Sequence, residues 1–314
     1  MGVLRLRSLG LIWLLCLFAG PLSAAVELPR EPVLRIETGA HLSPVTRIGS
    51  DVDGRWAVTA SEDKTARLWD LRSGRQLGVL RPPIGGDSIG ALYAVGMSPD
   101  GRQIALGGNS AFDDRTHAIY LFDRATATLP PKSTLSGLEA PLTQIAWSQD
   151  SQLIAIGLRQ SGLRVFRRNL GFVGSDPEFN DAIYGAAFSA DGRLAVASLD
   201  GYLRVYRFGK NGMERVLRRQ MPGVPYALDW SPDGRRLAVG LQDAPRAVVL
   251  SADSLELLET LDAGAPAISA GWPGLPTVVS CMRRAASPGT AASFSWPSTV
   301  LGAADVRSAV SAIR

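Results

Sequence analysis

Short apolar runs alternate with polar turns along most of the chain, and the runs fall into repeated groups of four. In each group an apolar run precedes an acidic turn, a second run follows it, and a third and a more variable fourth come after further turns. Apolar runs of this length, bounded by Gly, Asp, Asn or Pro, are typical of β-strands. Because no segment has the period of a long amphipathic helix, the pattern predicts an all-β chain.

The turn between the first and second runs sets the period of the repeat. Its acidic residue is, in five successive units, Asp53, Asp100, Asp150, Asp191 and Asp233. The spacings are 47, 50, 41 and 42 residues, which indicates one supersecondary unit per repeat. One four-stranded sheet cannot bury both of its faces, so successive sheets must stack face to face, and radial stacking gives a β-propeller.

Each unit is predicted to supply four strands. The first strands read VTRI, LYAVGMS, LTQIAWS, IYGAAFS and YALDWS, and the second read WAVTAS, QIALGG, LIAIGL, LAVAS and LAVGL. The third read TARLWD, AIYLFD, GLRVFR, YLRVYR and AVVLS, and the fourth read RQLGVL, KSTLSG, EFND, ERVLRR and LELLETL.

The order SPDGR, LAVGL and SEDKTARLWD at this period resembles the WD40-repeat family, over five units from about Val33 to Asp262. The resemblance implies a WD40-type β-propeller with five clear four-stranded blades and a degenerate sixth, the ring being truncated or open. In that family a His, a Ser or Thr, a turn Asp and a Trp form a hydrogen-bonded network within a blade. Only the first unit fits this pattern, with the residues His41, Ser61 or Thr59, Asp63 and Trp69.

In the other units Phe122, Phe166, Tyr206 and an aliphatic residue near Val249 take the place of the tryptophan. Those blades keep an apolar residue without the indole donor, so packing is expected to hold them together. The runs PVLRIETGAH, ASEDKTARLWDL and LYAVGMSPDGR also resemble exported bacterial WD40 proteins of a group often joined to a caspase-like peptidase domain. The resemblance does not extend to such a domain here.

The first 25 residues have the features of a secretory signal. Arg5 and Arg7 precede an apolar run over residues 9–18, and Ser23 and Ala25 have the spacing of a signal-peptidase site. We expect residues 1–25 to be removed by cleavage after Ala25, which predicts a periplasmic or secreted protein without stable membrane insertion. The alternative is an uncleaved anchor, but the apolar run is shorter than the ~20 residues that span a bilayer.

At the other end of the chain the repeat stops. The predicted propeller covers residues 26–272, and AISAGW at 267–272 starts like another first strand. Residues 273–314 are rich in Ala, Ser, Pro and Arg and lack the acidic turn. Two interpretations stand: a change of reading frame near Trp272, or a degenerate last blade followed by a flexible tail. PVLRIET at 32–38 is the predicted closing strand.

Composition and charge narrow the function. The 33 basic residues exceed the 29 acidic ones, but the excess lies in the two ends, which removes the main electrostatic argument for nucleic-acid binding. Four arginines on or after the third strands of neighbouring blades could form an outer band that binds carboxylates or phosphates, or could simply protect sheet edges. They are Arg164, Arg167, Arg204 and Arg207.

No motif supports catalysis, a cofactor or a metal site. The G-x-S-x-G pattern at residues 86–90 precedes a strand instead of a helix, and His41, His117 and Cys281 form no caspase-like pair. The first hypothesis is therefore a non-catalytic exported propeller that acts as a protein-protein interaction scaffold. Its alternatives are a propeller enzyme or ligand sensor that uses the mouth of the central channel, and a truncated remnant of a longer WD40 protein.

Overall fold

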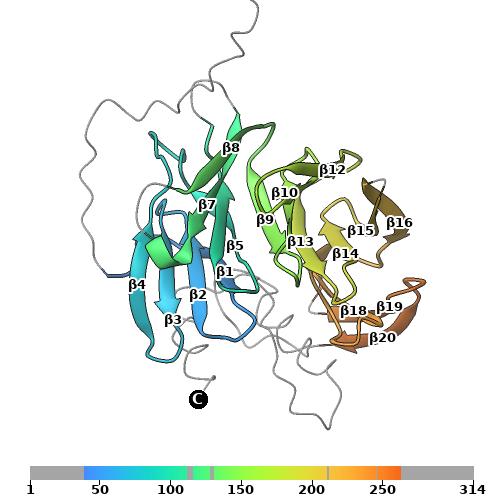
Figure 1. Ribbon diagram of the computed structural model, residues 1–314. Coiled ribbons are helices and arrows are strands. Elements are labelled where there is room, and N and C mark those ends of the chain that lie inside the picture. The colour runs from blue at the N-terminus through green and yellow to red at the C-terminus, as the bar shows by residue number, and fades with distance from the viewer. Residues whose placement is uncertain (1–38, 112–115, 128–130, 211, 245, 263–314) are drawn as a thin grey trace, which may run out of the picture. The chain divides into compact units, whose positions relative to one another are not determined.

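The computed structural model describes residues 39–111, 116–127, 131–210, 212–244 and 246–262. The expected signal peptide, closing strand and C-terminal segment lie outside these residues. Within them the chain forms twenty β-strands and one short 3₁₀ helix, η1 (Arg124–Thr126), and Figure 1 shows the strands in chain order from blue to orange. The predicted all-β fold is confirmed.

The strands form five antiparallel sheets of four, and each sheet is a simple meander. The first sheet contains β1 (Val45–Ser50), β2 (Trp56–Ser61), β3 (Ala66–Asp70) and β4 (Arg75–Leu80), and the second contains β5 (Leu92–Met97), β6 (Gln103–Gly108), β7 (His117–Asp123) and β8 (Ser133–Leu138). The third contains β9 (Leu142–Trp147), β10 (Leu153–Leu158), β11 (Leu163–Arg167) and β12 (Phe172–Asp176). The fourth contains β13 (Ile183–Phe188), β14 (Leu194–Ser198), β15 (Tyr202–Gly209) and β16 (Gly212–Gln220), and the fifth contains β17 (Pro225–Trp230), β18 (Arg236–Leu241), β19 (Arg246–Ser251) and β20 (Leu257–Asp262).

One predicted strand is wrong. The fourth strand of the third sheet is FVGSD in β12, whereas EFND at 178–181 connects this sheet to the next. Leu170, with a φ of 66°, makes the tight turn that sends the chain back along β11. Pro177 then follows the strand, and it cannot donate a ladder hydrogen bond. Because FVGSD contains Gly and Ser in place of apolar residues, the hydrophobic pattern does not predict this strand.

The hydrophobic core is divided among the interfaces between neighbouring sheets. Each of four large clusters takes its buried residues from two successive sheets, as Val58 and Leu106 do for the first pair and Val205 and Val239 for the last. Side chains along a strand point alternately to its two faces, so a sheet between two others buries both faces. This explains why the first and second strands of each unit are almost continuously apolar.

The first strands of the five units, which we call the inner strands, lie next to one another in chain order: β1 beside β5, β5 beside β9, β9 beside β13, and β13 beside β17. Four of the five have glycine or alanine at the penultimate position, and the two glycines pack closely against the next inner strand. A Cβ atom on Gly49 would lie 3.0 Å from the Met97 backbone nitrogen, and one on Gly96 would lie 3.0 Å from Trp147. The indole N–H of Trp147 donates to the Gly96 carbonyl at 3.2 Å, so side chain and backbone interlock between sheets.

Candidate functional site

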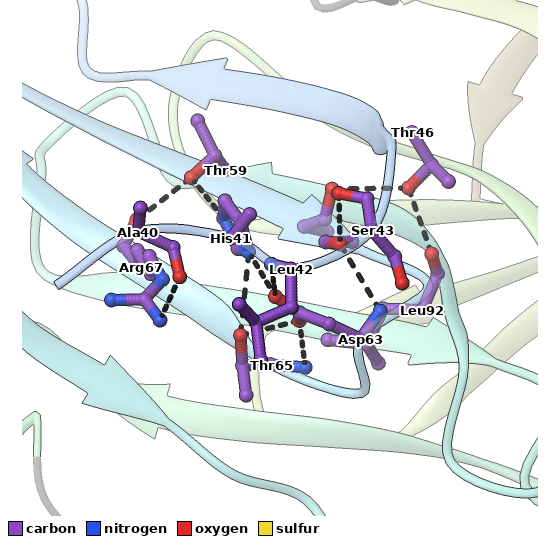
Figure 2. A network of polar contacts seen from close by, with 12 residues as sticks. Ala40, His41, Leu42, Ser43, Thr46, Thr59, Asp63, Thr65, Arg67 and Leu92 are labelled. Carbon is purple, nitrogen blue, oxygen red and sulfur yellow. Dashed lines mark hydrogen bonds and ion pairs between the residues drawn. The ribbon is translucent and has the colours of Figure 1, made fainter. Parts of the chain in front are cut away.

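The predicted network in the first sheet is formed around His41 (Figure 2). The Nδ1 atom of His41 lies 2.9 Å from Oδ2 of Asp63, and its Nε2 lies 2.9 Å from Oγ1 of Thr59. Because an ionised carboxylate only accepts, Nδ1 is the donor to Asp63. The indole N–H of Trp69 donates to the same Thr59 hydroxyl at 2.9 Å. The chain from Asp63 to Trp69 therefore joins the connector before β1 to β2 and β3.

Thr59, and not Ser61, supplies the central hydroxyl of this network. Ser61 instead donates to the Ser43 carbonyl at 3.0 Å and accepts the Asp63 N–H at 3.1 Å. Residues two apart in a strand share a face, so sequence spacing left both hydroxyls open. The structure resolves the choice in favour of Thr59.

The carboxylate of Asp63 is held in its ionised form. Burial opposes ionisation, but hydrogen bonds from His41, Thr65 and the Leu42 N–H outweigh it and keep the pKa of Asp63 well below its ordinary value. The Thr65 hydroxyl donates to Oδ1 at 2.6 Å and the Thr65 N–H at 2.9 Å. With every carboxylate oxygen occupied, the geometry fits a structural role.

The fourth sheet has a different polar network, centred on Arg204. This side chain is completely buried and forms a two-point ion pair with Asp200, at 2.7 and 3.1 Å. It also donates to the Glu178 carbonyl at 2.8 Å and lies 4.0 Å from the ring centroid of Phe179. Phe179 stands four residues before β13, where His41 stands relative to β1. Phe179 thus takes the histidine position, and an arginine on the third strand is the charged centre of this network.

Tyr206, at the tryptophan position of this sheet, is also a donor. Its hydroxyl donates to Asp176 at 2.7 Å, and Arg215 contacts the same carboxylate at 3.0 Å. Burial, followed by the hydrogen bond to Asp176, raises the pKa of Tyr206 far above its ordinary value. Hydrogen bonding and an ion pair therefore add to the packing that is expected to hold this sheet together.

The predicted arginine band is not one surface. Arg167 and Arg207 are exposed, but Arg204 is buried within the fourth sheet and cannot reach a partner. Arg164 is 15% exposed and forms an ion pair with Glu139 at 2.5 Å. Arg164 has the same register position on β11 as Arg204 has on β15, and Arg167 and Arg207 share another position. Strand register therefore separates the two exposed arginines from the two that are more buried.

Four of the five acidic turns share one construction. Asp100 accepts the Ser98 hydroxyl at 2.5 Å and the Arg102 N–H at 3.0 Å, and Asp150, Asp191 and Asp233 have equivalent serine partners. Asp53 does not fit. It is exposed and paired with Arg55, while Asp51 caps this turn by accepting the N–H groups of Arg55 and Trp56.

A cluster of tyrosines and a cavity lie at opposite ends of the inner strands, and each could contact a ligand. At the amino-terminal ends, three half-buried tyrosines occupy the second position of β5, β13 and β17; we call Tyr93, Tyr184 and Tyr226 the tyrosine cluster. The rings of Tyr184 and Tyr226 stack with centroids 5.0 Å apart. Arg47 lies 5.4 Å above the Tyr184 ring, and Arg159 lies 5.9 Å above that of Tyr93.

At the carboxyl-terminal ends lies a cavity of about 130 Å³, lined by residues from all five inner strands and the turns after β1, β5 and β9. Its walls include Trp147, Phe188 and Leu228, and its polar groups include Gln144 and Asp229. The sequence alone does not mark Asp229, because an acidic residue inside an apolar strand gives no motif. Asp229 stands out only when the five inner strands are aligned by register, because the other four have Gly49, Gly96, Ala146 and Ala187 at this position.

Among the described residues, no three His, Cys, Asp or Glu side chains come together as a metal ligand set. No helix in the described part of the chain is long and apolar enough to cross a membrane.

Five four-stranded sheets that bury their faces against one another, with their inner strands side by side, define a β-propeller. The family WD domain, G-beta repeat matches residues 32–70 and 173–207, which include β1 to β3 of the first sheet and β13 to β15 of the fourth. These matches identify WD40 repeats in the chain, and propellers of this family generally bind other proteins. No curated protein gave a significant match.

Proposed function

We propose that this chain is an exported, non-catalytic WD40 propeller that binds a partner protein through the tyrosine cluster and so acts as an interaction scaffold. The observation that carries the proposal is the alignment of Tyr93, Tyr184 and Tyr226 at equivalent positions of three inner strands, with two arginines beside them. Tyrosine and arginine are enriched among the residues that dominate binding energy at protein interfaces. Half-buried rings that are already stacked also lose little conformational freedom on binding.

The chemistry of this end suits a peptide segment. Burial raises the pKa of Tyr93, so its hydroxyl stays protonated and can donate or accept a hydrogen bond at neutral pH. Glu62 on the first sheet and Arg159 on the third both act electrostatically on Tyr93, so charges of both signs surround the rings. Apolar ring faces with polar rims are the usual composition of a transient protein interface.

Export is part of the proposal, and N-terminal sequencing of the mature protein tests it. We expect the mature chain to begin at Val26 and to be recovered from the periplasm or the medium, because Ser23 and Ala25 have the small side chains that signal peptidase requires. The variant Ala25→Arg should retain residues 1–25, whereas Val26→Ala should not. A wild-type chain that keeps its first 25 residues would contradict this expectation.

The tyrosine cluster is tested by replacing its members one at a time. We expect Tyr184→Ala and Tyr226→Ala each to weaken binding of the partner by about 2 kcal/mol or more, roughly 30-fold, since each removes a stacked ring from the contact surface. A photoreactive residue at position 93 would capture the partner in cells, and calorimetry with the purified pair would give the dissociation constants. The matched control is Phe172→Ala, which removes an aromatic ring that is 63% exposed on the outer strand β12. Equal affinities for all these variants would refute the assignment.

A further inference from the structure

The position of Asp229 is anomalous among the five inner strands. The four equivalent residues are glycine or alanine, and a Cβ atom at Gly49 or Gly96 would already lie 3.0 Å from the next inner strand. Leu228 and Trp230 face the fourth sheet, where the indole N–H of Trp230 donates to the Ala187 carbonyl at 2.9 Å. Because neighbours along a strand point to opposite faces, Asp229 lies on the other face of the fifth sheet, at the wall of the cavity.

Among the described residues, the carboxylate of Asp229 has no counter-charge. Its one hydrogen bond within the described residues is from the N–H of Trp230 at 2.8 Å, and it takes part in no ion pair there. Burial raises its pKa to about 6, and the single N–H bond offsets only part of this effect. A desolvated carboxylate without a partner is costly, so a cation that entered the cavity would gain an unused acceptor.

The charged side chains of the described residues near Asp229 do not supply that cation. Arg236 on β18 shares the face of Asp229, but within the described chain no ion pair joins them, and Arg236 acts on Asp233 instead. Strands β13 and β14 contribute no charged side chain. Asp51 also lines the cavity, but it is an acid, and its carboxylate accepts the N–H groups of Arg55 and Trp56.

We infer that the cavity binds a guanidinium group, with Asp229 as its anchor. A guanidinium is planar, donates two parallel hydrogen bonds to one carboxylate and stacks on aromatic or apolar surface. Trp147, Phe188 and Leu228 provide that surface, and Gln149 adds a polar group. The volume, about 130 Å³, exceeds the ~30 Å³ share of one water several times. One free carboxylate cannot provide the six to eight oxygen ligands that a calcium ion prefers.

Calorimetry with N-acetyl-arginine amide tests the inference on the full mature chain. We expect binding at pH 7.5, at least tenfold weaker binding of the uncharged analogue N-acetyl-citrulline amide, and weaker arginine binding at pH 5, where Asp229 is protonated. Asp229→Asn should lose at least tenfold in affinity with unchanged circular dichroism. The control Glu214→Gln, which neutralises an exposed carboxylate on β16, should bind as the wild type does.

Two further measurements distinguish a peptide arginine from the free amino acid as the ligand, and the cavity from the tyrosine cluster as its site. Free arginine that binds as well as the blocked form indicates a side-chain pocket, as for an arginine presented by a peptide; much tighter binding of free arginine indicates a site for the amino acid. The inference does not rest on the proposed function: Tyr226→Ala leaves Arg47 and Gln144 in place, so arginine binding without the partner should be unchanged. No binding by the wild type, equal binding of the citrulline analogue, or undiminished binding by Asp229→Asn would overturn the inference.

Discussion

Replacing Arg204 with alanine is expected to destabilise the protein by about 3–5 kcal/mol, because the change leaves the Asp200 carboxylate buried without its counter-charge. The two side chains are 0% and 1% exposed, so water cannot take over the role of the guanidinium. The loss also removes the hydrogen bond to Glu178 and the contact with Phe179. Urea unfolding followed by fluorescence would measure the change in the free energy of unfolding.

The matched control is Arg207→Ala, three residues further along the same strand. Arg207 is exposed and Arg204 is buried, so the control should change the free energy of unfolding by less than about 0.5 kcal/mol. Removing both charges in the double variant Arg204→Met with Asp200→Asn should recover part of the loss, since no unpaired charge remains. Similar losses for Arg204→Ala and Arg207→Ala would show that the ion pair does not stabilise the fourth sheet.

Asp63→Asn is expected to cost about 2–3 kcal/mol near pH 7, the size of effect that a strongly lowered carboxylate pKa implies. Asparagine keeps the shape of the side chain, but an NH2 group that cannot accept hydrogen bonds replaces one of the two carboxylate oxygens. The contacts with His41, Thr65 and Leu42 are therefore lost in part. Thermal and urea unfolding across a range of pH would record both the loss and its pH dependence.

The sign of that pH dependence follows from the direction of the shift. The pKa of Asp63 is lower in the folded state than in the unfolded state, so its contribution is fully present above the unfolded value of about 4 and declines as the pH falls below it. Wild type and Asp63→Asn should therefore converge in acid. The exposed Asp53 serves as control, because Asp53→Asn should change little at any pH. A difference that stays constant down to pH 2 would contradict the role of Asp63.

The repeat allowed most of the fold to be predicted, because turn chemistry and strand length are local properties that the sequence displays directly. The first, second and third strands of all five sheets follow the hydrophobic runs, and His41, Asp63 and Trp69 come together around a hydroxyl. The fourth strand of the third sheet was missed, because the ladder of β11 and a tight turn impose the extended form on a weak β sequence.

The charged centres could not be predicted, since their roles depend on contacts between residues far apart in sequence. Arg204 looks like an ordinary strand arginine until Asp200 and Phe179 are placed around it. Asp229 becomes informative only when five inner strands are aligned by register. In both cases burial, which the sequence does not display for a charged residue, changes the interpretation.

Arg47 gives the two ends of the inner strands a shared group. The guanidinium of Arg47 packs over the Tyr184 ring in the tyrosine cluster and donates a hydrogen bond of 3.2 Å to the side-chain oxygen of Gln144. Gln144 also lines the cavity that contains Asp229. A ligand that displaces this guanidinium at one end alters the hydrogen bonding of the amide at the other. The coupling free energy would be the same in both directions, so partner and guanidinium would report on each other's occupancy.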